Sequence, residues 1–166
     1  MHKITKIPIT LGLNLCVFAS GSGSNLLAII EACKSGFISS RVVLVISNNS
    51  SSGALEVAKK NNIPSFHLSQ KLFNTESEFA ERLLDLLNEY RVDLILLAGY
   101  MKMLSTKVVK KYSGRILNIH PALLPKYGGK GMYGIHVHEA VIAAKEKFTG
   151  ATVHMVNEDY DSGEII

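Results

Sequence analysis

Apolar runs alternate with segments of helical periodicity along most of this chain. Runs that end in small or polar residues are typical of buried parallel strands. They predict strands at 13–19, 41–46, 63–68, 92–98, 115–119 and 151–156. Apolar positions three or four residues apart predict helices at 25–33, 52–62, 106–112 and 136–147, and one more that begins after Thr75.

The helix after Thr75 has the clearest start signal, because Thr75 and Glu78 have the spacing of a capping box. Its apolar positions share one helical face and are Phe79, Leu83, Leu86, Leu87 and Tyr90. Strands that alternate with helices of this length indicate an α/β fold with a largely parallel central sheet flanked by helices on both faces. Ligands bind such sheets beyond the carboxyl ends of the strands, so the residues after each strand are the functional candidates.

The composition indicates a single folded domain. The chain has 166 residues, of which 47% are hydrophobic and 19% are charged, and this excludes intrinsic disorder. Two cysteines, Cys16 and Cys33, are too few for a disulfide framework or a cysteine-rich metal centre. The formal charge of +4 is spread over short clusters, which suits small anionic ligands better than nucleic acid.

The N-terminal residues have the order of a signal peptide, with a basic segment at 1–6, an apolar segment at 7–18 and small residues at 19–21. Polar and helix-breaking residues interrupt the apolar segment, and no apolar run reaches the roughly 18 residues of a membrane span. We therefore expect a cytoplasmic protein in which residues 1–12 form a flexible extension.

The sequence S-G-S-G-S-N at 20–25 follows the first strand and opens a helix. Glycine lets the backbone approach a ligand closely, and the free N–H groups of a helix N-terminus attract anions. We interpret this loop as a phosphate site, with a ligand-free tight turn capped by serine as the alternative. NAD and ATP are not expected, because Leu26 stands where a dinucleotide fingerprint needs glycine and no G-K-[ST] follows.

Asn118 and His120 stand at the end of the strand at 115–119, just before Pro121. The two-residue period of a strand places both side chains on the same face. An imidazole can transfer a proton near neutral pH, and an amide can stabilise an oxyanion. We interpret the two residues as a catalytic pair rather than as a buried histidine beside a hydrogen-bond partner.

The remaining polar residues give weaker signals. Composition alone favours a solvated turn for the acidic residues Glu158, Asp159 and Asp161. His136 and His138 lie two residues apart near a helix start and do not share a face, so no zinc site is expected. His154 lies in the middle of a strand, and the sequence does not say which face of the sheet it occupies.

Four motifs occur in order along the chain: F-A-S-G-S-G-S-N-L at 18–26, L-A-G-Y-M-K-M-L at 97–104, L-N-I-H-P-A-L-L-P at 117–125 and D-Y-D-S-G at 159–163. Together they resemble the phosphoribosylglycinamide formyltransferases, also called glycinamide ribonucleotide transformylases, over residues 13–166. The resemblance implies a single Rossmann-like formyltransferase domain. It also implies transfer of a formyl group from 10-formyltetrahydrofolate to the amine of glycinamide ribonucleotide, in purine biosynthesis.

Carried onto the matching positions, the resemblance makes Asn118, His120 and Asp161 the catalytic residues and so overrides the solvated reading of the acidic turn. Its other implied contacts are with the ribonucleotide phosphate at Gly23, Ser24 and Asn25, with the same substrate at Gly99 and Pro121, and with folate at Tyr100, Met101, Lys102, Met103, Leu104, Val156 and Asp161. Direct attack by the amine needs neither a covalent enzyme intermediate nor a metal. Asn118 and a protonated His120 would stabilise the tetrahedral oxyanion, while Asp161 assists proton transfer.

The sequence departs from the family pattern at its end, because the family continues with another strand and a C-terminal helix after the position of Ile166. The loop at 128–134 is longer than in the shortest family versions, so no contacts are carried over to it. The alternatives are a related folate enzyme, such as methionyl-tRNA formyltransferase or formyltetrahydrofolate hydrolase, and a non-catalytic module that binds a nucleotide phosphate. We expect small-molecule substrates, no nucleic acid or membrane partner, and a monomer or homodimer.

Overall fold

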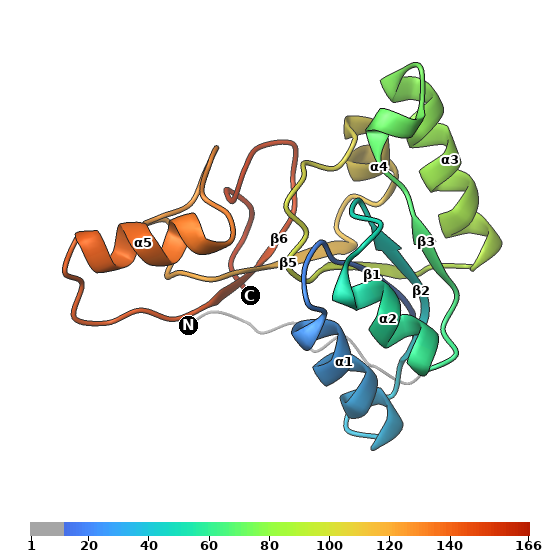
Figure 1. Ribbon diagram of the computed structural model, residues 1–166, viewed down its shortest axis with the longest axis horizontal. Helices are drawn as coiled ribbons and strands as arrows, with labels where there is room; N and C mark the ends of the chain where they lie inside the picture. Colours follow the sequence, from blue (N-terminus) through green and yellow to red (C-terminus); the bar gives the residue numbers. More distant parts are fainter. Residues whose placement is uncertain (1–11) are drawn as a thin grey trace, which may run out of the picture.

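The computed structural model describes residues 12–166, which form a six-stranded sheet in the order β3-β2-β1-β4-β5-β6 (Figure 1). The strands are β1 (Asn14–Phe18), β2 (Arg41–Ser47), β3 (Ser65–His67), β4 (Leu94–Leu97), β5 (Ile116–His120) and β6 (Thr152–Met155). The first five run parallel, and β6 pairs antiparallel with β5. The predicted strands and the largely parallel sheet are confirmed. The flexible extension expected at 1–12 lies, apart from residue 12, outside the described residues.

Helices cover both faces of the sheet. They are α1 (Ser24–Lys34), α2 (Gly53–Lys60), α3 (Glu76–Glu89), α4 (Thr106–Lys111) and α5 (Ile135–Ala143), with a short 3-10 turn, η1 (Gln70–Leu72), that the pattern did not predict. In β1, Cys16 and Phe18 pack in the hydrophobic cluster that contains α3 and α4. Val17, and Ala19 just after the strand, pack in the cluster that contains α1 and α2. Because each face is covered, the central strands read as continuous apolar runs.

Some details of the predicted elements differ from the structure. β3 is shorter than the run at 63–68 because Pro64 has no N–H for the ladder. The helix predicted at 136–147 ends at Ala143, where Lys145 turns the chain with a φ of 53°. In the capping box Thr75 accepts the N–H of Glu78 at 3.1 Å, but the Glu78 carboxylate accepts from Asn74 instead of Thr75.

The loop at 121–134 leads from β5 to α5, which projects from the rest of the molecule (Figure 1). Val137 and Val141 of α5 pack with Ala122 in a small separate cluster. Thr152 of β6 holds the start of the loop, because its hydroxyl donates to the Ala122 carbonyl at 2.7 Å and accepts from the Leu124 N–H at 3.0 Å. The antiparallel strand therefore anchors the loop that borders the carboxyl end of β5.

The chain after β6 crosses back over that strand at Gly163, where an added Cβ would overlap the carbonyl oxygen of Met155. We expect Gly163→Ala to push the crossing segment away and to lower the free energy of unfolding by about 1–3 kcal/mol. Gly21→Ala is the matched control, because nothing lies within 4 Å of its added Cβ. Urea denaturation of both variants measures the difference, and equal midpoints would contradict the close crossing.

Candidate active site

A cavity of about 690 Å³ lies beyond the carboxyl ends of β4 and β5. Its lining comes from the start of α1 at Asn25, from 99–104 after β4, from 118–121 at the end of β5, from 129–134 in the loop before α5, and from 156–161 after β6. The cavity therefore lies where the sequence predicted the functional candidates, at the residues that follow the strands.

The side chain of Asp161 is the centre of a polar cluster in the cavity wall, and only 12% of it is exposed. Its Oδ2 lies 3.5 Å from Nδ1 of His120 and accepts the Gly129 N–H at 3.0 Å. Its Oδ1 lies 3.4 Å from Nε2 of His154 and accepts from the Asn118 amide at 3.4 Å. The solvated turn predicted from composition is therefore wrong for Asp161, although Glu158 and Asp159 are exposed.

The hydrogen bonds assign the protons of both imidazole rings. Nε2 of His120 lies 2.7 Å from the Tyr127 carbonyl, and Nδ1 of His154 lies 2.8 Å from the Met155 carbonyl. A carbonyl only accepts, so each of these nitrogens carries a hydrogen. Nε2 of His154 then accepts from the Asn118 amide at 3.1 Å. Both amide hydrogens of Asn118 are thus directed at protein partners, His154 and Asp161.

His154 is the member of this cluster that the sequence did not identify. It is 2% exposed, and the antiparallel register places it directly opposite Asn118. Strand periodicity alone left its face undecided, because only the pairing of β6 with β5 relates the two strands. The signal that would have found it is therefore the strand register and not the local sequence.

The glycine loop has a different cap from the predicted alternative. The N-cap of α1 is Gly23, with a φ of 82° and no side-chain cap, so the serine cap is wrong. A Cβ at Gly23 would lie 2.7 Å from the Cα of Ala54, so the position needs glycine. The first helical bond runs from Leu27 to Gly23, which leaves the N–H groups of the first turn free of helical partners. Asn25 reaches the cavity lining, whereas Gly23 and Ser24 lie outside it.

The residues assigned to folate by resemblance all belong to the cavity lining. Tyr100, Met101, Lys102, Met103 and Leu104 after β4 all line the cavity, and so do Val156, Asp161, Gly99 and Pro121. Tyr100 packs edge-on against Phe18 at a centroid distance of 5.3 Å, and burial raises the pKa of its phenol to about 12. Tyr100 therefore stays neutral at physiological pH.

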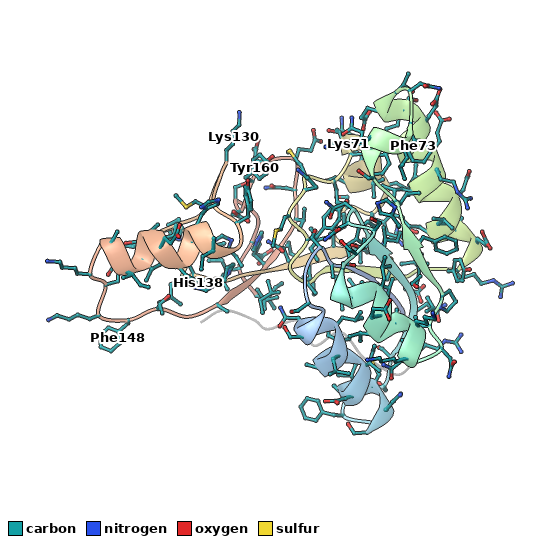
Figure 2. The ribbon with its side chains drawn as sticks, in the orientation of Figure 1. Lys71, Phe73, Lys130, His138, Phe148 and Tyr160 are labelled. Carbon is teal, nitrogen blue, oxygen red and sulfur yellow. The ribbon has the colours of Figure 1, made fainter. Side chains whose placement is uncertain are left out.

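Lys130 and Tyr160 also line the cavity, and Figure 2 shows the side chain of Lys130 extending away from the ribbon. His138 of α5 also lines the cavity, whereas the exposed His136 pairs with Glu139 at 3.5 Å. In residues 12–166 no group of three histidine, cysteine, aspartate or glutamate side chains is placed to hold a metal ion. No helix in the same residues is long and apolar enough to cross a membrane.

Known proteins are similar to this chain in sequence and in fold. The chloroplastic phosphoribosylglycinamide formyltransferase of Arabidopsis thaliana is 44% identical over 153 residues, which cover 92% of this chain and 52% of that protein. The phosphoribosylglycinamide formyltransferase of Haemophilus influenzae is 42% identical over 152 residues, which cover 92% of this chain and 69% of that protein. The chain thus spans about half the length of the plant relative.

The fold agrees with a solved structure as well. Glycinamide ribonucleotide transformylase 1 from Symbiobacterium toebii matches with a TM-score of 0.86 and 35% identity, over 93% of this chain and 71% of that chain. The Rossmann-like fold implied by the motifs is therefore confirmed. Residues 13–166 match the family described as Formyl transferase, and because that match spans the sheet, the glycine loop and the cluster around Asp161, this chain belongs to the formyl transferase family.

Proposed function

We propose that this protein transfers a formyl group from 10-formyltetrahydrofolate to the amine of glycinamide ribonucleotide, in purine biosynthesis. One observation carries the proposal: the Asp161 carboxylate lies within 3.5 Å of His120, His154 and Asn118 in the wall of a cavity that extends to the start of α1. The names of the relatives support this substrate pair.

The arrangement suits both substrates. The free N–H groups at the start of α1, with Gly23, Ser24 and Asn25, would hold the ribonucleotide phosphate. The largely apolar stretch from Tyr100 to Leu104, together with Val156, would hold the pteridine ring of the folate co-substrate, and a cavity of about 690 Å³ is large enough for such a ligand. Gly99 and Pro121 would contact the nucleotide. A single domain at 13–166, a cytoplasmic location, and a monomeric or homodimeric state belong to the same proposal.

In the proposed reaction the substrate amine forms a bond to the formyl carbon, and the bond from that carbon to the folate nitrogen breaks. Asn118 and a protonated His120 would stabilise the oxyanion formed between these two events. Asp161 would hold His120 and help to move the proton from the attacking amine to the leaving nitrogen, directly or through water. No side chain needs to form a covalent bond to the substrate.

The hydrogen bonds of the structure add a condition to this mechanism. Nε2 of His120 donates to the Tyr127 carbonyl, and both amide hydrogens of Asn118 have protein partners. An oxyanion can receive these hydrogens only if a substrate oxygen displaces one protein acceptor. We therefore expect the loop that carries Tyr127 to shift when both substrates are bound.

The first test is formyl transfer from a 10-formyl folate analogue, followed by absorbance, with and without glycinamide ribonucleotide. Consumption that requires the nucleotide supports the proposal. We expect His120→Ala to lower kcat by about 10²–10⁴-fold, the range for loss of a general acid or base, with nucleotide affinity nearly unchanged. Consumption without the nucleotide would indicate a hydrolase instead.

The matched control for this test is His136→Ala. His136 is also a histidine of the same region, but its side chain is 57% exposed and lies outside the cavity lining. Its replacement should leave kcat within about two-fold of the unmodified protein, since surface substitutions away from a site have small effects. Equal turnover in His120→Ala and His136→Ala would overturn the catalytic assignment.

Asn25→Leu tests the phosphate site at the start of α1. We expect the Kd for glycinamide ribonucleotide to rise by about ten-fold, which is a loss of about 1.4 kcal/mol, while the Kd for the folate analogue changes little. Isothermal titration calorimetry measures both constants. Asn88→Leu on the exposed surface of α3 is the control. Equal losses for the two ligands would contradict the phosphate role of Asn25.

A further inference from the structure

Ser20 joins the two halves of the proposed site. It stands two residues after β1, at the start of the glycine loop, and is 7% exposed. Its N–H donates to the carbonyl of Gly99 at 3.0 Å, and its carbonyl accepts from the Asn49 side chain at 3.3 Å. Its backbone is therefore bonded to the loops that follow β4 and β2.

The hydroxyl of Ser20 makes a second pair of bonds to the same two loops. It donates to the side-chain carbonyl of Asn48 and accepts the backbone N–H of Met101 at 2.9 Å. Met101 belongs to the cavity wall, whereas Ser20 lies outside the lining. The Ser20 hydroxyl thus links the start of the cavity wall at 99–104 to the glycine loop at 20–25.

We propose that Ser20 is a positioning residue for formyl transfer, which holds the wall at 99–104 in register with the glycine loop at 20–25. The inference rests on the proposed function, since these segments are the proposed folate and phosphate sites. Ser20 touches neither substrate, so its loss removes no direct contact. It changes the alignment of amine and formyl carbon, on which the rate depends steeply, because a displacement of about 1 Å can cost up to 10²-fold.

The test compares Ser20→Ala with Ser47→Ala. Ser47 is another buried serine, at the end of β2, but its hydroxyl bonds only to the backbone of Asn49, at 3.1 and 3.2 Å. We expect Ser20→Ala to lower kcat by about ten-fold while the Kd of each substrate alone stays within about three-fold. We expect Ser47→Ala to keep kcat within about two-fold at a similar change in Tm.

This pattern separates positioning from a general structural role. A loss of stability alone would lower Tm in both variants, and the two variants would then have the same kcat at saturating substrate. A kcat for Ser20→Ala equal to that of Ser47→Ala would overturn the proposal. A rise in the binary Kd with unchanged kcat would also overturn it, since that result would place Ser20 in direct binding.

Amide hydrogen exchange tests the link between Ser20 and the wall at 99–104 without depending on catalytic activity. The peptide at 99–104 should exchange faster in Ser20→Ala, because the Met101 N–H loses its acceptor, and should be unchanged in Ser47→Ala. If the unmodified protein shows no turnover, the proposed function fails while faster exchange still supports the link. Unchanged exchange in Ser20→Ala overturns the link.

Asn48→Ala is the second variant, and it replaces Ser20→Ala if that protein does not fold. It removes the acceptor that orients the Ser20 hydroxyl but keeps the serine itself. We expect a smaller fall in kcat in the same direction and faster exchange at 99–104. If kcat and the exchange at 99–104 both match those of the unmodified protein, the proposal is contradicted.

Discussion

Burial of both faces of the sheet is the constraint on which the rest of the structure depends. The side chains of β1 and β2 are apolar on both sides, so helices must cover each face and the connections between neighbouring strands must cross over. Five strands therefore run in one direction and end at one edge. Residues far apart in sequence therefore lie near one another at this edge: Ser20 is hydrogen bonded to Gly99, and Gly99 lines the same cavity as His120.

The polar cluster at this edge follows from a second constraint, the cost of a buried carboxylate without partners. Asp161 accepts hydrogen bonds from the Asn118 amide of β5 and from the Gly129 N–H in the loop at 121–134, and the rings of His120 and His154 lie 3.5 and 3.4 Å from its oxygens. Its backbone has a φ of 47°, which is uncommon for a residue other than glycine, and Gly163 allows the close crossing just beyond it. Strand pairing, turn conformation and side-chain bonding thus support the same position of one carboxylate.

Two kinds of hydrogen bond meet in the site and have different consequences for function. In the proposed reaction the bonds of His120 and Asn118 to protein acceptors would be exchanged for bonds to a substrate oxygen, so they define a resting arrangement. The bonds of Ser20 involve no reacting group, so they can persist through the reaction. A site that combines exchangeable and permanent bonds in this way can respond to a developing charge while the distance between its two substrate regions stays constant.

By itself the sequence determined the strands, the order of strands and helices, the glycine loop and the shared face of Asn118 and His120. These features depend on periodicity and on neighbouring residues, which act locally. The tertiary structure alone decided that His154 faces Asn118, because that depends on the register between strands whose paired residues lie 36 positions apart. The tertiary structure also placed Asp161, and not the nearby acids Glu158 and Asp159, in the polar cluster. The family resemblance had indicated Asp161, whereas composition had favoured a solvated turn. The tertiary structure alone also decided the bonds of Ser20 to Asn48 and Met101, which span 28 and 81 positions, because no local rule relates segments that meet only when the sheet is assembled.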